Sequence, residues 1–509
     1  MHIDVITCNV QAVSGNEKLQ PEKALVAGLC KVLPMDLPGI TCRHIDLELT
    51  AAENRLPLST EDGLLAELGE ANANTSIAYR HQRRWLLDYE NTPFDASKQA
   101  NTIPPRLRQN GVYLITGGTG GVGMALAGYL AKTVKAKLIL TARTALPPAS
   151  GWDDWLQKHD KDDPTSEKIR RLRELEAAGA ELMLAAVDVS DAEQMTLLRD
   201  SALQKFGAIH GVIHAAGVVS GDSLDSLSRL TKEQCEQQFQ PKIYGLLVLK
   251  DLFNNRPLDF MMPVSSLSTV LGGLGFAAYT AANRFMDALA QQQYWQGNTQ
   301  GLSVDWEGWD FTGQAAPSGS TGSLALTPAE GQLVFDRLLR QGRTPQLIIS
   351  SASLPYRIKQ WQPEKITPDE AGESVDSGAE HSRPALSSDY AEAGNETEQT
   401  LVDIWQDALG IDAIGINDNF FELGGDSVLN IQITATAKQH GLALSPKDVF
   451  EHQTIAQLAA FASAQETTKQ AKAGQATAPE AAVEEPPAED DGDISDSDLA
   501  EILRQQEMQ

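Results

Sequence analysis

A glycine-rich turn between a strand and a helix is the feature that most constrains this chain. Residues 116–123 read TGGTGGVG; they begin at the end of the apolar run VYLIT and lead into the apolar segment MALAGYLAK. Glycines here permit a tight turn and let the backbone approach a pyrophosphate at the helix N-terminus. A glycine-rich turn without a ligand is the alternative, but the flanking strand and helix favour a dinucleotide site.

Short apolar runs alternate with helical segments after this turn. This alternation predicts an α/β fold with a parallel, doubly wound sheet of the Rossmann type. Pro263 lies inside one run and has no N–H for a ladder, which indicates a bulge or a strand end. The region 1–105 also alternates strands and helices, but no glycine-rich turn follows its strands, so we expect no nucleotide there. The runs are VYLIT, KLILT, AELMLAAVDV, IHGVIHAAG, LDFMMPVSS, LSVDWEGW and PQLIIS.

The strand ends of this region supply further candidate cofactor contacts. Arg143 follows the run KLILT, where an acid would bind the ribose of NAD and an arginine suits the 2′-phosphate of NADPH. A plain surface charge is the alternative for Arg143. Asp188 ends the next strand and could meet the adenine. The predicted cofactor-binding residues are Gly117, Gly118, Thr119, Gly120, Gly121, Val122, Gly123, Arg143, Asp188, Val189, Ala215, Ala216 and Gly217.

Length and composition bound the class of protein. A chain of 509 residues predicts two to four domains. Its net charge of -28 argues against a nucleic-acid surface. There is no run of eighteen apolar residues and no signal-peptide pattern, and the four cysteines lack CxxC spacing. We therefore expect a cytoplasmic protein with reduced thiols and no bound metal.

The composition changes after Trp361. Residues 363–395 are polar, acidic and rich in Pro, Gly and Ser, which predicts a flexible linker. Residues 396–464 show helical spacing of apolar residues and predict a small helical domain. Residues 465–509 form a low-complexity acidic tail, and the segment ISDSDLAEILRQQ near its end could form one amphipathic helix.

A tyrosine and an asparagine lie four residues apart in the segment GFAAYTAANRF. Tyr279 and Asn283 would share one face of a helix. A tyrosine that donates a proton near pH 7 needs help, because its free pKa is about 10. Ser266 ends a predicted strand thirteen residues earlier, where its hydroxyl could hold a carbonyl oxygen while Tyr279 protonates it. A packing tyrosine and a capping serine are the alternatives.

This spacing resembles the short-chain dehydrogenase/reductase superfamily, and most closely the ketoreductase domains of modular polyketide synthases. In those domains the lysine and asparagine positions of the catalytic tetrad look exchanged, so the lysine comes from an earlier helix. The matching segment here is QFQPKIYGLLVL, which makes Lys242 the partner of Tyr279. The resemblance implies that its ammonium lowers the phenol's pKa and binds the nicotinamide ribose, while Asn283 keeps the helix open for a relay water.

The resemblance also divides the chain. Residues 1–105 look like the structural subdomain of such ketoreductases, a truncated Rossmann-like unit without cofactor, and residues 106–362 look like the catalytic subdomain. The Leu-Asp-Asp signature of B-type domains is replaced here by Val219-Ser220-Gly221, which leans towards A-type product stereochemistry. The tryptophan that A-type domains often carry is Leu271 here.

The motif FFELGGDS resembles the attachment site of acyl and peptidyl carrier proteins, which are four-helix bundles. Ser427 would receive 4′-phosphopantetheine from a phosphopantetheinyl transferase; a helix-capping serine is the alternative. The motif does not separate acyl from peptidyl carriers. The final segment resembles the docking motifs that end some assembly-line subunits, with a disordered tail as the alternative.

These features predict an NADPH-dependent reductase of a β-ketoacyl thioester held on a carrier protein. The parent system would be a polyketide synthase, of the trans-acyltransferase or hybrid polyketide/non-ribosomal peptide kind. One alternative is an α-ketoacyl reductase beside a peptidyl carrier in a depsipeptide synthetase. A second is a catalytically silent unit that serves other synthase subunits as a scaffold.

Overall fold

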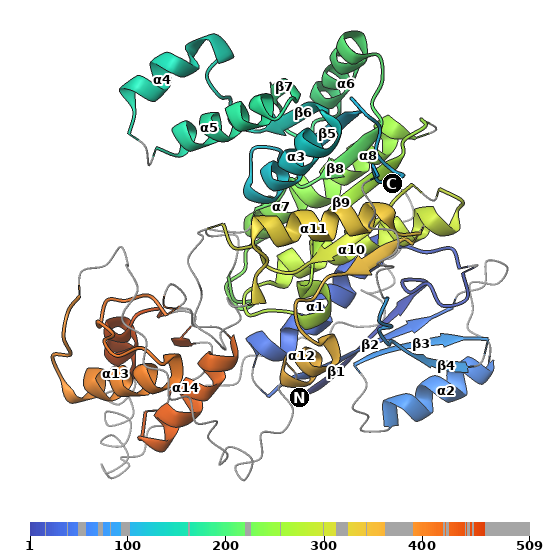
Figure 1. Ribbon diagram of the computed structural model, residues 1–509. Coiled ribbons are helices and arrows are strands. Elements are labelled where there is room, and N and C mark those ends of the chain that lie inside the picture. Colours follow the sequence, from blue (N-terminus) through green and yellow to red (C-terminus); the bar gives the residue numbers. More distant parts are fainter. Residues whose placement is uncertain are drawn as a thin grey trace, which may run out of the picture. The chain divides into compact units, whose positions relative to one another are not determined.

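The computed structural model covers the whole chain (Figure 1). It describes residues 1–15, 17–37, 39–48, 58–69, 75–81, 83–92, 102–160, 163–218, 225–254, 256–298, 300–311, 324–342, 344–361, 390–420, 423, 427–442, 444, 448–449 and 452–463. The predicted docking helix of the tail and the linker up to residue 389 lie outside these ranges. The predicted domain limits stay predictions.

A four-stranded sheet forms the N-terminal part, in the order β1-β2-β3-β4. The first three strands are parallel and β4 is antiparallel to β3. The elements are β1 (His2–Cys8), η1 (Pro21–Lys23), α1 (Ala24–Asp36), β2 (Thr41–Leu47), α2 (Leu58–Gly69), β3 (Ser76–Arg80) and β4 (Arg83–Leu86). This short sheet agrees with the predicted truncated Rossmann-like subdomain.

A seven-stranded parallel sheet forms the second part, in the order β11-β10-β9-β8-β5-β6-β7. The first strand of this sheet in the sequence, β5, lies inside it, and later strands are added on both sides. The predicted doubly wound α/β fold is therefore confirmed (Figure 1). The strands are β5 (Val112–Thr116), β6 (Lys137–Ala142), β7 (Glu181–Ala186), β8 (Gly211–His214), β9 (Phe260–Ser266), β10 (Ser303–Trp306) and β11 (Gln346–Ile348).

Helices connect these strands. Their ends carry ordinary stop and start signals: Asp191 caps α6 through the N–H groups of Glu193 and Gln194, and Gly207 ends it in the left-handed conformation. The helices are α3 (Gly121–Val134), η3 (Ala149–Gly151), α4 (Trp152–Lys158), α5 (Pro164–Ala177), α6 (Ala192–Phe206), α7 (Lys232–Phe239), η4 (Gln240–Tyr244, a π-turn), α8 (Gly245–Phe253), α9 (Ser268–Leu271), α10 (Ala277–Trp295), α11 (Pro328–Arg340) and α12 (Leu354–Trp361).

Alternate residues of the central strands enter two separate cores. On β5, Tyr113 and Ile115 pack into one hydrophobic cluster, whereas Val112 and Leu114 pack into the other. Successive side chains of a strand point to opposite faces, so both faces of the sheet are buried under helices. Pro263 lies within β9 and not at the predicted strand end. It is the last register position against β8 and comes just before the first against β10, so its missing N–H falls where the pairing passes from one neighbour to the other.

The carrier region contains α13 (Glu396–Leu409) and α14 (Ser427–Gln439), and residues 455–463 are also helical. Asn395 caps α13 through the N–H of Glu398. Trp405 is fully buried and packs on Phe420, with ring centroids 5.0 Å apart. The predicted four-helix bundle stays a prediction, since the rest of this region lies outside the described residues.

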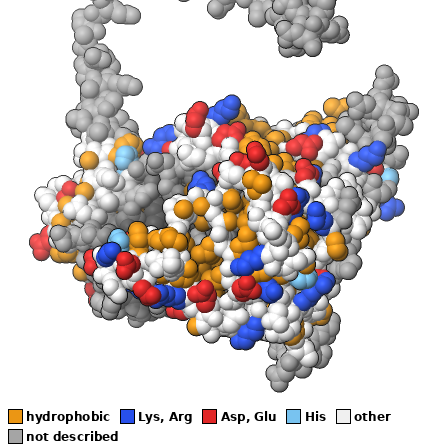
Figure 2. All heavy atoms as spheres, turned by 90° about the horizontal axis from the view of Figure 1, so that it is seen from above, with side chains coloured by type: hydrophobic (Ala, Val, Ile, Leu, Met, Phe, Trp, Pro, Cys, Tyr) orange, Lys and Arg blue, Asp and Glu red, His pale blue; other side chains and the backbone are white. Residues whose placement is uncertain are grey.

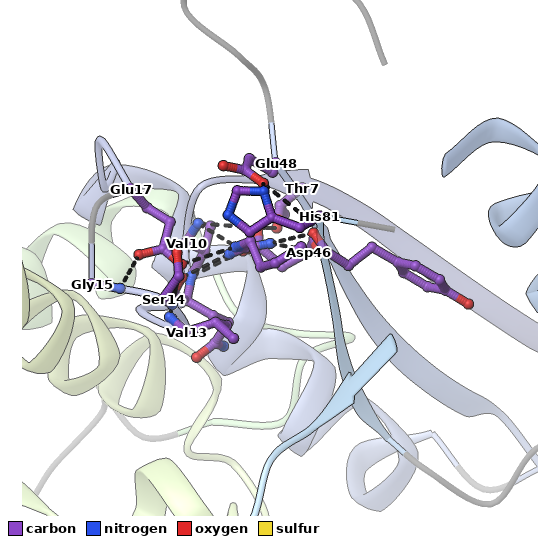
Figure 3. Close-up of polar contacts among 12 residues, drawn as sticks. Thr7, Val10, Val13, Ser14, Gly15, Glu17, Asp46, Glu48 and His81 are labelled. Atoms are coloured by element: carbon purple, nitrogen blue, oxygen red, sulfur yellow. Dashed lines mark hydrogen bonds and ion pairs between the residues drawn. The ribbon is translucent and has the colours of Figure 1, made fainter. Parts of the chain in front are cut away.

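The loop after β1 is the place where a complete nucleotide-binding unit would have its glycine-rich turn. Here its N–H groups bond to carboxylates of the chain itself (Figure 3). Glu17 accepts from the N–H groups of Val13, Ser14 and Gly15, and Asp46 accepts from that of Val10. Burial acts to raise the pKa of Glu17, but these donors hold it at about 2. The N–H groups of Val10, Val13, Ser14 and Gly15 are therefore already bonded within the chain.

Arg80 completes this network from β3. Its guanidinium is 1% exposed; it pairs with Asp46 and Glu17 and donates to the main-chain oxygens of Gln11, Asp46 and Tyr79. An arginine that neutralises two buried carboxylates also holds the ends of β2 and β3 against the loop after β1.

Removing Arg80 should therefore strongly destabilise the N-terminal part. We expect Arg80→Met to lower the free energy of unfolding by about 3–5 kcal/mol, because two carboxylates lose their buried partner. The matched control is Arg108→Met, since Arg108 pairs with Asp259 at the surface and such pairs contribute about 0–1 kcal/mol. Urea denaturation of both variants measures the difference, and equal losses would contradict the assignment.

Candidate functional site

The glycine-rich turn packs closely against the main chain that follows β8. Gly117 has a positive φ of 65°, and a Cβ there would lie 2.6 Å from the main-chain oxygen of Ala215. A Cβ on Gly123 would lie 2.5 Å from the oxygen of Gly117. Gly120 caps the N-terminus of α3. The turn after β5 and the end of β8 are thus pressed together, and only glycine fits at Gly117 and Gly123.

The other predicted cofactor residues surround this turn at the carboxyl ends of the strands. Arg143 is exposed just after β6. Asp188 follows β7, and its carboxylate accepts from the N–H of Ser190 at 2.8 Å and from its hydroxyl at 2.7 Å. Val189 is buried in the core, where it packs near Gly245. The Val189 side chain therefore packs in the core, and the cofactor contacts predicted for Asp188 and Val189 stay predictions.

Phe311 is a residue of this region that the sequence reasoning missed. A Cβ on Gly121 would lie 2.5 Å from its ring, so the ring lies directly over the first residue of α3. Phe311 stacks on Trp309, which packs against Trp306 at the end of β10. The only signal in the sequence is the aromatic spacing in DWEGWDF.

Lys242, Tyr279 and Asn283 come together from distant parts of the chain. Lys242 is 4% exposed, and its Nζ donates to Asn283 Oδ1 at 2.8 Å and to the Val264 oxygen at 3.3 Å. The same Nζ lies 5.1 Å from the centre of the Tyr279 ring. Asn283 Nδ2 donates to the main-chain oxygen of Tyr279 at 2.9 Å. Asn283 therefore connects the lysine with the helix that carries the tyrosine.

Local structure explains how Lys242 reaches this position. It lies on the π-turn η4, which interrupts the helix formed by α7 and α8 at Pro241. Proline removes a backbone donor, and single π-turns inside helices often occur at functional sites. A Cβ on Gly217 would lie 3.1 Å from Lys242 Cε, so the loop after β8 lies against the lysine stem.

The pKa values of the site differ from the sequence expectation in one respect. Burial raises the pKa of Tyr279, while hydrogen bonding by Ser266 and by Asn283 opposes that rise. We expected Lys242 to lower this pKa, which is wrong for the protein alone because burial outweighs the polar partners. Burial also lowers the pKa of Lys242 to about 8, and the negative charge of Asp287 opposes that effect.

His214, at the end of β8, is a further buried group. Its Nδ1 is 2.8 Å from the hydroxyl of Thr116 at the end of β5. Burial and the nearby Lys242 lower its pKa to about 3, so the imidazole is neutral near pH 7. This hydrogen bond joins the carboxyl ends of β5 and β8, and the glycine-rich turn begins at the end of β5.

Two buried acids behind the site also escaped the sequence reasoning. Asp287 is 2% exposed and lies one turn after Asn283 on α10; Asp305 is fully buried on β10. Asp287 accepts from the hydroxyl of Ser303 at 2.7 Å, and Asp305 accepts from that of Thr269 at 2.9 Å. Burial raises the pKa of both carboxyls, and repulsion by Asp287 raises that of Asp305 further. Folding therefore favours the protonated form of both carboxyls.

The carrier motif is described only in part. Ser427 is the first residue of α14, as the motif predicts. Residues 424–426 lie outside the described residues, and the contacts of the Ser427 side chain are not described. Its role as attachment residue stays a prediction from the sequence.

The matches to known families agree with this site. Residues 111–310 match the family described as "KR domain", and residues 399–462 match the family described as "Phosphopantetheine attachment site". The chain is 29% identical over 451 residues to the polyketide synthase PksL of Bacillus subtilis, covering 86% of this chain and 10% of that protein. It is 30% identical over 384 residues to the 6-methylsalicylic acid synthase of Aspergillus terreus, covering 71% of this chain and 21% of that protein.

Solved structures lead to the same class. An N-terminal ketoreductase from the macrolactin assembly line is 27% identical with a TM-score of 0.52, covering 70% of this chain and 64% of that one. A ketoreductase domain from the bacillaene assembly line is 25% identical with a TM-score of 0.55, covering 70% and 79%. The chain therefore carries a reductase domain of the Rossmann type. More particularly, it carries a ketoreductase domain of the polyketide synthase kind, followed by a phosphopantetheine carrier domain.

The chain spans about a tenth of the length of the first relatives, PksL and PksM. Among the described residues, no helix is long and apolar enough to cross a membrane. Within the same residues, no group of three or more His, Cys, Asp or Glu side chains could hold a metal ion. Acidic and basic side chains are interspersed on the face drawn in Figure 2.

The acid pair predicts a pH dependence of stability. A carboxyl whose pKa is raised by folding contributes stability that is full below the unfolded pKa, near 4, and is lost as pH rises through the folded pKa. We expect Asp305→Asn to reduce this loss, because the amide cannot ionise and can donate to Asp287, which remains buried.

Urea denaturation between about pH 5 and about pH 9 measures this slope for each variant. Asp200→Asn is the control, since Arg199 lowers the pKa of this exposed carboxyl and its contribution changes only in acid. If wild type and Asp305→Asn lose stability equally at high pH, the raised pKa of Asp305 does not contribute to the loss.

Proposed function

We propose that this chain reduces the ketone of a carrier-bound β-ketoacyl thioester to the β-hydroxyacyl thioester. The observation that supports this most is the meeting of Lys242, Asn283 and Tyr279 beside the glycine-rich turn, from segments 41 residues apart in the chain. The matched ketoreductase and carrier families agree with a ketone substrate on a phosphopantetheine arm.

The proposed cofactor is NADPH, which when bound supplies the hydride to the ketone carbon. The residues present fit it: Gly117 and Gly123 leave no room for a Cβ, and the N-terminus of α3 offers N–H groups to a pyrophosphate. Arg143 is exposed after β6, at the position from which it would contact a 2′-phosphate.

Tyr279 is the proposed acid. Its phenol donates a proton to the ketone oxygen as the carbon accepts the hydride, and Ser266 orients that oxygen by a hydrogen bond. Lys242 stabilises the phenolate that is left, and Asn283 holds Lys242 in place through its Oδ1. Because the pKa of Lys242 is about 8, its ammonium is present at neutral pH and is lost at alkaline pH.

The carrier domain supplies the substrate in this proposal. A phosphopantetheinyl transferase attaches the arm to Ser427, and the arm's thiol carries the acyl thioester. Partners are other domains or subunits of a polyketide synthase, reached in part through the acidic tail. A cytoplasmic location and an A-type stereochemical outcome remain predictions from the sequence.

The two alternatives lead to different measurements. An α-ketoacyl reductase of a depsipeptide synthetase would prefer α-ketoacyl over β-ketoacyl thioesters. A catalytically silent scaffold would consume no NADPH with either. Assays of both thioester classes, with the loss of NADPH absorbance as the readout, distinguish the β-ketoacyl reductase, the α-ketoacyl reductase and the silent scaffold.

Tyr279→Phe should lower kcat with a β-ketoacyl thioester by about a hundredfold to ten-thousandfold, because the proton donor is lost. Tyr294→Phe is the matched control, the same change on the same helix, and should leave kcat unchanged. NADPH absorbance gives both rates, and equal rates for the two variants would rule out Tyr279 as the acid.

Ser427 should gain one phosphopantetheine group on incubation with coenzyme A and a phosphopantetheinyl transferase. Intact-mass spectrometry measures the gain, which Ser427→Ala should abolish. Thr400→Ala, which removes a hydroxyl from α13 in the same domain, should retain it. A mass gain in Ser427→Ala would place the attachment elsewhere.

A further inference from the structure

One carboxylate of the N-terminal part connects two loops of the catalytic part. Asp36 ends α1 and is 1% exposed. Its Oδ1 accepts from the N–H of Gly275 at 2.9 Å, and its Oδ2 accepts from the N–H of Leu227 at 2.9 Å. These partners lie 239 and 191 residues away in the sequence. Each oxygen thus serves a different loop.

The first loop leads directly to the proposed acid. Gly272 and Gly275 have positive φ, and a Cβ on Gly272 would lie 3.0 Å from the sulfur of Met35 on α1. The loop therefore lies against the last turns of α1, where only glycine fits. Phe276 follows; its oxygen accepts from the N–H of Thr280, and its ring packs edge-on against that of Tyr279, with centroids 5.5 Å apart.

The second loop leads away from β8 and reaches the lysine. It passes Gly217, whose Cα faces the stem of Lys242, and its later part forms a turn at Ser226. Ser226 is 3% exposed, and its oxygen accepts from the N–H groups of Arg229 and Leu230. The N–H of Leu227 inside this turn is the one that Asp36 accepts. The first loop thus adjoins Tyr279. In the second, Gly217 adjoins Lys242 and Leu227 bonds to Asp36, and residues 219–224 between them lie outside the described residues.

We propose that Asp36 is a positioning residue of the ketoreduction, which fixes the separation of these two loops and so the orientation of the acyl chain beside Tyr279. The proposal rests on the proposed function. A carboxylate suits the task because each of its two oxygens accepts from one N–H, and hydrogen bonds to a charged acceptor are stronger than neutral ones. An asparagine side chain keeps one oxygen and has an NH2 donor in place of the other, so one of the two N–H groups faces a donor and loses its acceptor.

The contact itself is tested without any turnover, by hydrogen–deuterium exchange of the full chain. In Asp36→Ala, the amides of Leu227 and Gly275 should lose protection together, because one side chain accepts from both. In Asp36→Asn, at least one of the two amides should lose protection, because only one oxygen remains. The matched control is Asp4→Asn, a carboxylate of the same subdomain that accepts from Arg43 and touches neither loop. Unchanged protection of both loops in the Asp36 variants would overturn the proposal.

The effect on the reaction is tested on the same variants with a β-ketoacyl thioester. We expect kcat to fall between about tenfold and about a hundredfold with unchanged KM for NADPH, because the acyl chain is misplaced while the glycine-rich turn is untouched. The ratio of the two hydroxyl stereoisomers should also change. A residue that only stabilises the fold would lower the active fraction and leave that ratio as it is.

Asp36→Asn keeps the proposal testable if Asp36→Ala does not fold, since the amide preserves the shape of the side chain. Loss of protection with an unchanged stereoisomer ratio and unchanged kcat would overturn the positioning role. Wild type that fails to reduce any ketoacyl thioester would overturn the proposed function, while the exchange experiment would still decide whether Asp36 holds both loops.

Discussion

The proposed reaction depends on one buried hydrogen bond, from the Lys242 ammonium to Asn283 Oδ1 at 2.8 Å. An ammonium taken out of water is costly unless polar groups replace the lost water, and Asn283 and the Val264 oxygen do so here. Because Lys242 comes from the turn between α7 and α8 and Asn283 from α10, the same bond joins two helical segments. The hydrogen bond that stabilises the Lys242 ammonium therefore also holds these two helical segments together.

Buried carboxyl groups in the described part of the chain are stabilised in different ways. Asp46 is neutralised by Arg80, Asp36 accepts from two backbone N–H groups, and burial raises the pKa of Asp287 and of Asp305. In each case the partner comes from a distant segment, and a buried acceptor without its donor is costly. These groups therefore specify which segments meet, in a way that hydrophobic burial alone does not.

The sequence predicted what depends on local pattern. The glycine-rich turn, the alternation of strands and helices, and the shared helix face of Tyr279 and Asn283 all have short-range signatures. Lys242 came from resemblance alone, because nothing in its own surroundings marks it as more than a helix lysine. Asp36, Asp305 and Phe311 could not be found, since their roles come from contacts across the fold. The expected lowering of the phenol's pKa failed for a related reason, because burial is a property of the folded chain.

Polar groups of the N-terminal part bond both within that part and to the catalytic part. The loop after β1 donates the N–H groups of Val13, Ser14 and Gly15 to Glu17, while the carboxylate at the end of α1 accepts from the two loops of the catalytic part. Between these ends α1 crosses α10 so closely that a Cβ on Gly28 would lie 2.7 Å from Ala281 Cα. Without this part, α10 would expose that face and both loop amides would lose their acceptor. The N-terminal part thus supports, by packing, the helix that carries Tyr279.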